Sequence, residues 1–284
     1  MSSLASPPHS VGWNARLALD FAFDRGHTRL IRKGQSGPLA VQRPFFPEGP
    51  AICHVYLLHP PGGLVPGDAL ALTAHVGTEA SALLTVPAAT KIYRSDGRTA
   101  RQDQCLSVAP GGTLEWLPQE TILFDRAKAR LSTRVELSPG ANFIGWDLVC
   151  FGRPACGEDF SQGTCQQTLE VWRGDRPLLI ERARYESEVL SAAYGLRGMP
   201  VVATFLACGP ALDKDTIPGL LEKLRALKPV GNDLLSATML GDLLVLRYLG
   251  GNAEHARQHL ENAWRQVRPL LLSRPATPPR VWST

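Results

Sequence analysis

One stretch of the sequence, 43–68, concentrates residue types that could do chemistry. A strand-like segment within it carries Cys53, His54 and His59, and a run of prolines and glycines follows. Such a run makes a stiff loop, which would present Asp68 at a fixed position. From there Asp68 could touch a metal ion, or it could accept hydrogen bonds from the backbone amides of a rigid turn. Both interpretations stay open at this point.

Three carboxylates lie inside apolar, strand-like segments: Glu115, Asp147 and Glu181. A carboxylate in a strand that is buried on both faces is costly unless it is paired, hydrated or coordinated. The arginines available for ion pairs are Arg153, Arg182 and Arg184. The alternative to structural ion pairs is a hydrated internal cavity or channel that the carboxylates line.

Two further features could serve a site. The segment 151–160 is punctuated by glycines and carries an arginine and two acids, so it could be a partner-binding loop or an ordinary long loop. His255 and His259 are four residues apart in a helical segment, a spacing that can hold a metal ion. They flank the apolar face of that helix, however, which favours solvated or partly packed histidines.

Short runs of alternating apolar and polar residues extend from about residue 17 to 194, as in Leu70, Leu72, Ala74 and Val76. Turn signals rich in proline and glycine separate these runs, for example at 60–63 and 110–112. Alternation of this kind is typical of strands with one buried face. The sequence therefore predicts a mainly β fold, with a β-helix-like or stacked-sheet body of many short strands over 11–197.

The pattern changes after residue 198. Strands are predicted over 201–208 and 243–249, and helices over 216–227 and 253–267, where prolines stop each helix. We expect a small C-terminal α/β part over 198–272, with two helices in strand–helix–strand–helix order, packed on the β body so that 1–284 is a single structural unit. The ends, 1–10 and 273–284, are expected to be flexible, although Val281 and Trp282 could dock.

The composition excludes several classes of protein. The chain has 284 residues, of which 44% are hydrophobic and 20% charged, so a sizeable core is expected and general disorder is not. A net charge of +4 is too small to indicate nucleic-acid binding. Without a P-loop, no nucleotide is expected. The stretch 199–212 is too short for a membrane helix, and the first ten residues do not resemble a signal peptide.

The six cysteines form no CxxC pair, which fits reduced thiols in a cytoplasmic protein.

Several segments of the chain resemble a known family. They are 41–45 (Val-Gln-Arg-Pro-Phe), 53–68, 87–95, 114–120, 146–160 and the ending 279–282 (Pro-Arg-Val-Trp). Several long segments in the right order are more specific than one short motif, and these run through most of the chain. The chain resembles urease accessory protein D, the UreD family, which is called UreH in some organisms.

The resemblance implies a scaffold for urease maturation that is not itself an enzyme. Proteins of this kind dock on apo-urease, bind the accessory protein UreF, and recruit the GTPase UreG through UreF. UreE is a possible nickel donor. Nickel in transit is the implied cargo, and it would pass through an internal route to the urease active site. The implied fold, a β-helix-like body with a small α/β part, agrees with the pattern above.

A route for a divalent ion needs weak, exchangeable ligands, which carboxylates and water provide and clustered thiolates do not. The first candidates for lining such a route are Asp68 and Glu181. Three further candidates are Asp147, Glu48 and Glu158. The cysteine and histidines of segment 43–68 could take part, but a role in the strand core is preferred for them. No catalytic or cofactor-binding residue is predicted.

Two other hypotheses stay open. Acids in β structure could be the paired carboxylates of a β-helical enzyme that acts on a carbohydrate, which would require two carboxylates facing one open cleft. The chain could also be a plain protein-binding module without metal traffic. Substitutions such as Asp68→Ala or Glu181→Gln would separate this module from a scaffold with a nickel route.

Overall fold

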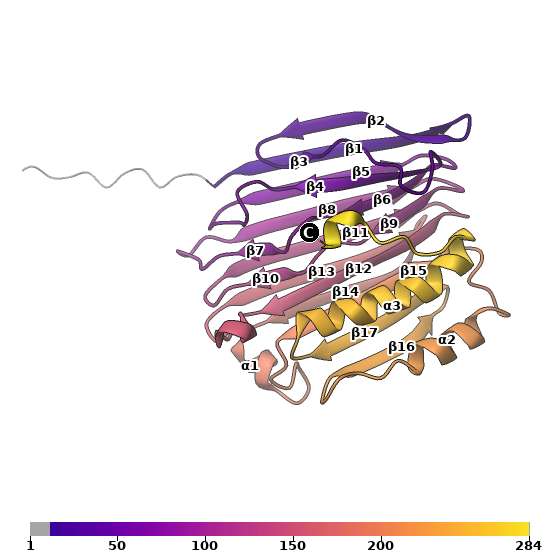
Figure 1. Ribbon diagram of the computed structural model, residues 1–284. Coiled ribbons are helices and arrows are strands. Elements are labelled where there is room, and N and C mark those ends of the chain that lie inside the picture. The colour runs from indigo at the N-terminus through magenta and orange to yellow at the C-terminus, as the bar shows by residue number, and fades with distance from the viewer. Residues whose placement is uncertain (1–11, 284) are drawn as a thin grey trace, which may run out of the picture.

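The body of the protein consists of two stacked sheets, seen in a computed structural model that describes residues 12–283 (Figure 1). The seven-stranded sheet has the strand order β14-β13-β11-β8-β5-β1-β2. Its strands are β1 (Asn14–Asp24), β2 (His27–Ser36), β5 (Ala69–Val76), β8 (Ala100–Val108), β11 (Lys128–Leu137), β13 (Thr164–Arg173) and β14 (Arg176–Tyr185).

The second sheet has ten strands. Its main path has the order β16-β17-β15-β12-β9-β6-β4-β3, and β10 joins β12 to β7 beside this path. Its strands are β3 (Ala40–Val41), β4 (Ile52–Leu58), β6 (Ser81–Thr85), β7 (Thr90–Ile92), β9 (Thr113–Trp116), β10 (Thr121–Leu123), β12 (Asn142–Phe151), β15 (Val201–Cys208), β16 (Leu234–Leu240) and β17 (Leu243–Gly250).

The chain winds between the two sheets like a solenoid. From β4 to β13 the long strands alternate between the sheets, and neighbours within each sheet are parallel: β4, β6, β9 and β12 in one sheet, and β5, β8, β11 and β13 in the other. Antiparallel pairs follow at the ends, such as β1–β2 and β13–β14. The predicted mainly β, β-helix-like or stacked-sheet body is confirmed.

Two helices, α2 (Ile217–Arg225) and α3 (Ala253–Leu272), cover the outer face of the ten-stranded sheet (Figure 1). The described residues also form a short helix α1 (Ser187–Ser191) and the 3₁₀ turns η1 (Pro154–Cys156) and η2 (Arg280–Ser283). The two helices predicted for the C-terminal part are therefore α2 and α3. Within residues 12–283, none of the helices has the length and apolar character needed to cross a membrane.

The C-terminal part differs from the prediction in two details. The helix α3 runs through Pro269 to Leu272 instead of ending before the proline, because the buried Leu271 continues its apolar face and Arg268 is held by Glu115 of β9 and Glu48 of the turn before β4. The strand β16 was not predicted. It lies at the edge of the sheet, and its burial alternates, but the apolar Leu234 and Leu240 lie on the exposed face and weaken the alternation in the sequence.

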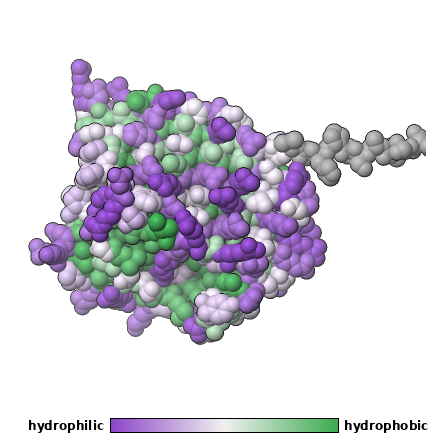
Figure 2. Space-filling view, turned by 180° about the vertical axis from the view of Figure 1, so that it is seen from behind, coloured by the Kyte–Doolittle hydropathy of each residue, from purple (hydrophilic) through white to green (hydrophobic). Residues whose placement is uncertain are grey.

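Each strand's sequence pattern reflects whether its sheet is covered on one face or on two. Strand β11 alternates because one face of the seven-stranded sheet meets solvent. Figure 2 views the molecule from the side opposite the helices and shows polar side chains spread between apolar patches. Strand β12 lies between the other sheet and α3, so nearly all its residues are buried and its sequence is almost continuously apolar.

Two apolar cores result from this layering. One lies between the sheets and includes Leu17, Leu106 and Val135. The other lies between the ten-stranded sheet and the helices and includes Phe205 and Trp264.

The C-terminal segment packs against the second core. The indole nitrogen of Trp282 donates a hydrogen bond to Thr85 Oγ1 at 2.9 Å, and its ring lies near those of Trp146 and Trp264. Trp282 therefore docks on the second core, as considered from the sequence. The expected flexibility of 273–284 stays a prediction, and the expected flexible end 1–10 lies outside the described residues.

Candidate functional site

Two rows of polar side chains face each other between the sheets. On the ten-stranded sheet, strand pairing aligns Asp147 of β12 with Thr204 of β15 and Arg247 of β17. On the seven-stranded sheet, strand pairing aligns Gln104 with Thr133, then Leu169, then Glu181. A neighbouring row there carries Gln102 and Gln167. The inward positions of these strands are otherwise mostly apolar, so the polar rows form a distinct path through the interlayer.

Three cavities follow one another along this path. The first has a volume of about 290 Å³ and is lined by His59, Lys91 and Gln102, among others. The second, of about 30 Å³, shares Gln102 with the first and is also lined by Asp147. The third, of about 10 Å³, shares Asp147 with the second and reaches Glu181. Cavities of roughly 10–15 Å³ or more can hold a water molecule when polar groups line them. We call this series the interlayer passage.

Asp147 lies at the junction of the second and third cavities. Gln167 Nε2 donates a hydrogen bond to Asp147 Oδ2 at 2.8 Å. Burial raises the pKa of the Asp147 carboxyl, and the nearby negative charge of Glu181 raises it further, although the bond from Gln167 acts against both. A nearby cation would relieve this unfavourable charge.

Glu181 lies at the end of the passage and is held by an arginine. Arg247 Nη1 lies 2.9 Å from Glu181 Oε1, and Arg247 Nη2 lies 2.5 Å from Oε2. The side chains are 42% exposed for Arg247 and 31% for Glu181, so the pair lies where the interlayer opens to solvent. The hydrogen bonds raise the pKa of Arg247, which burial alone would lower.

The middle of the passage has polar groups with spare hydrogen-bonding capacity. Thr133 Oγ1 donates to Gln104 Oε1 at 2.9 Å. Gln102 Oε1 is buried and has no hydrogen-bond partner in the described part of the chain. A buried amide oxygen without a partner is costly, so this atom indicates a position for water or a cation.

The structure brings Asp147 and Glu181 together but places the other three predicted carboxylates elsewhere. Asp68 accepts hydrogen bonds from the backbone amides of Trp13 and Val65, at 2.8 and 2.9 Å. It does not line any of the three cavities. This geometry agrees with the interpretation in which Asp68 accepts hydrogen bonds from backbone amides of a rigid turn.

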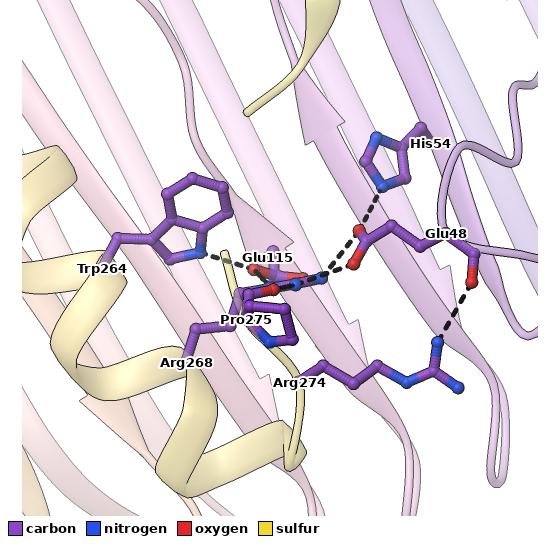
Figure 3. A network of polar contacts seen from close by, with 7 residues as sticks. All are labelled: Glu48, His54, Glu115, Trp264, Arg268, Arg274 and Pro275. Atoms are coloured by element: carbon purple, nitrogen blue, oxygen red, sulfur yellow. Dashed lines mark hydrogen bonds and ion pairs between the residues drawn. The ribbon is translucent and has the colours of Figure 1, made fainter. Parts of the chain in front are cut away.

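Glu48 belongs to a buried network between α3 and the sheet (Figure 3). Its carboxylate accepts hydrogen bonds from Arg268 Nη1 and Nη2 at 2.8 Å each, and His54 Nε2 lies 2.8 Å from Oε1. Arg268 also binds Glu115, to which the indole nitrogen of Trp264 donates. Burial would raise the pKa of Glu48, but the bonds from His54 and Arg268 outweigh it and lower the pKa to about 2.

Glu158 binds residues of its own loop and of the neighbouring turn after β10. It pairs with Arg153, which stacks over the ring of Phe124, and its Oε1 accepts from the amide of Asp125 at 3.0 Å. The loop lines a separate cleft of about 390 Å³ that also involves the α1 region.

The arginine partners expected for the carboxylates in strands, Glu115, Asp147 and Glu181, were wrong. Arg182 lies near Glu170, and Arg184 lies near Glu186.

The histidines and cysteines are dispersed. His54 is bound to Glu48, His59 lines the first cavity, and His255 lies 3.2 Å from Asp233. Burial raises the pKa of the Cys53 thiol to about 12. Over residues 12–283, no group of three or more histidine, cysteine or acidic side chains is arranged to hold a metal ion.

Sequence reasoning missed the passage residues Gln102, Gln104, Thr133, Gln167 and Arg247. A signal was present in β8 and β11, where alternation assigns Gln102, Gln104 and Thr133 to inward positions. Polar residues at buried positions are unusual and indicate a hydrated or functional interior.

The fold and this site define a β-solenoid-like protein with a polar, carboxylate-bearing passage between its sheets. The comparison with known proteins gives a match over nearly the whole chain. The family described as "UreD urease accessory protein" matches residues 14–283, and the chain belongs to this family.

Similar curated proteins carry the same description. A "Urease accessory protein UreD" from Pseudomonas putida is 46% identical over 276 residues, which cover 97% of this chain and 96% of that protein. One from Alkalilimnicola ehrlichii is also 46% identical, over 99% of this chain and 94% of that protein. A "Urease accessory protein UreD 2" from Brucella anthropi is 42% identical, over 97% and 100% respectively. A role in urease maturation follows from the family.

Proposed function

We propose that this chain is a non-enzymatic scaffold that docks on apo-urease and binds UreF, which recruits the GTPase UreG. In this proposal Ni²⁺, supplied by a donor such as UreE, crosses the interlayer passage on its way to the urease active site. The chain itself would bind no nucleotide, nucleic acid or membrane, and it would act in the cytoplasm, where its six free cysteines stay reduced.

One observation carries the nickel part of the proposal. Asp147 and Glu181, which come from different sheets, both line the third cavity, which shares Asp147 with the second cavity, and the second shares Gln102 with the first. Oxygen ligands without clustered thiolates bind a divalent ion weakly enough to release it. Gln102 lines the first and second cavities, and its unpartnered Oε1 supports hydration between the first cavity and the two carboxylates.

The size of the third cavity favours an ion over an organic substrate. The cavity between Asp147 and Glu181 has a volume of about 10 Å³, which suits about one water molecule. A glycosidase needs its two carboxylates on either side of a bound sugar, in an open cleft. The geometry therefore gives the carbohydrate-acting alternative no support.

The test is urease activation in cells that carry the urease genes and this chain. We expect Asp147→Asn and Glu181→Gln to lower urease activity and the nickel content of purified urease, while both variants still co-purify with apo-urease and UreF. Glu170→Gln is the matched control, because Glu170 is a paired carboxylate that lies outside the passage. Unchanged nickel content in both passage variants would favour the plain protein-binding module.

A further inference from the structure

Arg247 occupies the place where a divalent ion would meet Glu181. Both carboxylate oxygens of Glu181 are engaged by the two terminal nitrogens of the guanidinium. A bidentate contact of this kind uses the oxygens in the plane that a metal ion would also use. A cation can therefore bind Glu181 through those oxygens only after the guanidinium has moved away.

The pair is arranged so that Arg247 can leave. Its side chain is 42% exposed, so the guanidinium can turn to water without crossing the core. An ion pair with this exposure contributes little to folding, about 0–1 kcal/mol. The buried pair of Arg268 and Glu115 differs sharply, since both of those side chains are fully enclosed.

The strand register explains why Arg247 is at this position. Arg247 is aligned with Thr204 and, through it, with Asp147, so the three residues form one row on the ten-stranded sheet. Glu181 projects from the other sheet and meets the end of that row. The row thus carries the negative charge of Asp147 at one end and the positive charge of Arg247 at the other, with Thr204 between them.

We propose that Arg247 is a displaceable counter-ion, which holds Glu181 in the ion-free protein and turns to solvent when Ni²⁺ binds between Asp147 and Glu181. This inference rests on the proposed function. The competition between the guanidinium and the ion keeps the site weak, so that the ion is not trapped between two carboxylates. Arg247 is a positioning residue in this scheme, because it acts through Glu181.

The experiment measures Ni²⁺ binding to the purified full-length chain by calorimetry and Ni²⁺ release by mixing with a chelator. Arg247→Gln should bind Ni²⁺ about tenfold more tightly and release it more slowly, since both the competing contact and a positive charge are removed. Arg247→Lys, which keeps the charge but cannot make the bidentate contact, should fall between this variant and the wild type.

The control is Arg134→Gln, which breaks a comparable ion pair with Glu170 outside the passage and should leave Ni²⁺ binding unchanged. Equal or weaker affinity in a folded Arg247→Gln protein overturns the inference. If that variant does not fold, Arg247→Lys is the deciding variant. Wild-type Ni²⁺ affinity and wild-type Ni²⁺ release in Arg247→Lys would then overturn the inference. The proposed passage fails separately if Asp147→Asn leaves wild-type Ni²⁺ binding unchanged.

Discussion

Arg268 of α3 and Glu115 of β9 form a buried ion pair although 153 residues separate them in the sequence. Arg268 Nε lies 2.9 Å from Glu115 Oε2, and both side chains are completely buried. Glu48 binds the other side of the same guanidinium. The three charges are surrounded by polar partners, so they fix α3 in one position on the ten-stranded sheet (Figure 3).

Removal of the arginine should therefore destabilise the whole protein. Arg268→Met leaves Glu48 and Glu115 buried without their cation, and we expect the free energy of unfolding to fall by about 3–5 kcal/mol. Urea unfolding followed by circular dichroism measures the change. Arg265→Met in the same helix is the control, because Arg265 is 48% exposed and lies 3.9 Å from its partner Glu261. A control effect as large as that of Arg268→Met would contradict this account.

Acid should weaken the same network through Glu48. Its pKa falls from an ordinary 4.5 to about 2 in the folded protein, because the bonds from His54 and Arg268 outweigh the effect of burial. A carboxyl with a lowered pKa stabilises the fold fully above its unfolded pKa, and this contribution is lost as the pH falls through the folded pKa. The contribution of Glu48 is about 3 kcal/mol near neutral pH.

The prediction concerns the difference in free energy of unfolding between the wild type and Glu48→Gln. This difference should be largest above about pH 5 and should shrink as the pH falls towards 2. Unfolding curves at a series of pH values measure it. Glu222→Gln is the control, because Glu222 is exposed on α2, and its difference from the wild type should stay small at every pH. A Glu48→Gln difference that is constant with pH would contradict the prediction.

Much of the fold could be predicted from the sequence, since local patterns carry it. Alternation in β5 and β11 identified strands with one buried face, and helical spacing identified α2 and α3. Strand β16 was harder to recognise, because the apolar Leu234 and Leu240 lie on its exposed face and interrupt the alternation at both ends of the strand.

The candidate site was predictable only in part. The strand acids were recognisable because a carboxylate in an apolar strand is costly, and two of them, Asp147 and Glu181, do line one cavity. Their partners were not recognisable. Glu181 meets Arg247, 66 residues later, and Glu115 meets Arg268, because strand winding and helix docking decide which distant side chains come together.

The cysteines should differ strongly in reactivity. Burial raises the pKa of Cys150 to about 11 and that of Cys208 to about 12, so little thiolate forms in the folded protein. Cys156, in the turn η1, is exposed. With an aromatic disulfide reagent at pH 8 we expect one fast thiol and, after unfolding, six.

Cys156→Ser should abolish the fast reaction. Cys105→Ser is the matched control, because Cys105 is half-buried and burial raises its pKa, so its removal should leave the fast reaction in place. A fast phase that persists in Cys156→Ser would show that a core thiol becomes accessible through local opening.

Asp68 should matter for the fold and not for nickel. Asp68 is 4% exposed, and its carboxylate accepts hydrogen bonds from the backbone amides of Trp13 and Val65, which ties the start of β1 to the loop before β5. In Asp68→Asn the amide NH₂ group would face one of these backbone donors. The free energy of unfolding should then fall by about 1–3 kcal/mol, as expected when a buried donor loses its acceptor.

The measurement that separates the two roles is Ni²⁺ binding to folded Asp68→Asn protein, with Asp147→Asn measured in parallel. We expect wild-type affinity in the first variant and weakened binding in the second, because Asp147 lines the passage and Asp68 does not line any of its three cavities. Any loss of urease activation in Asp68→Asn should follow its loss of stability and recover at lower temperature. If Asp68→Asn weakens Ni²⁺ binding without destabilising the protein, Asp68 takes part in the route directly, through a path that the three cavities do not trace.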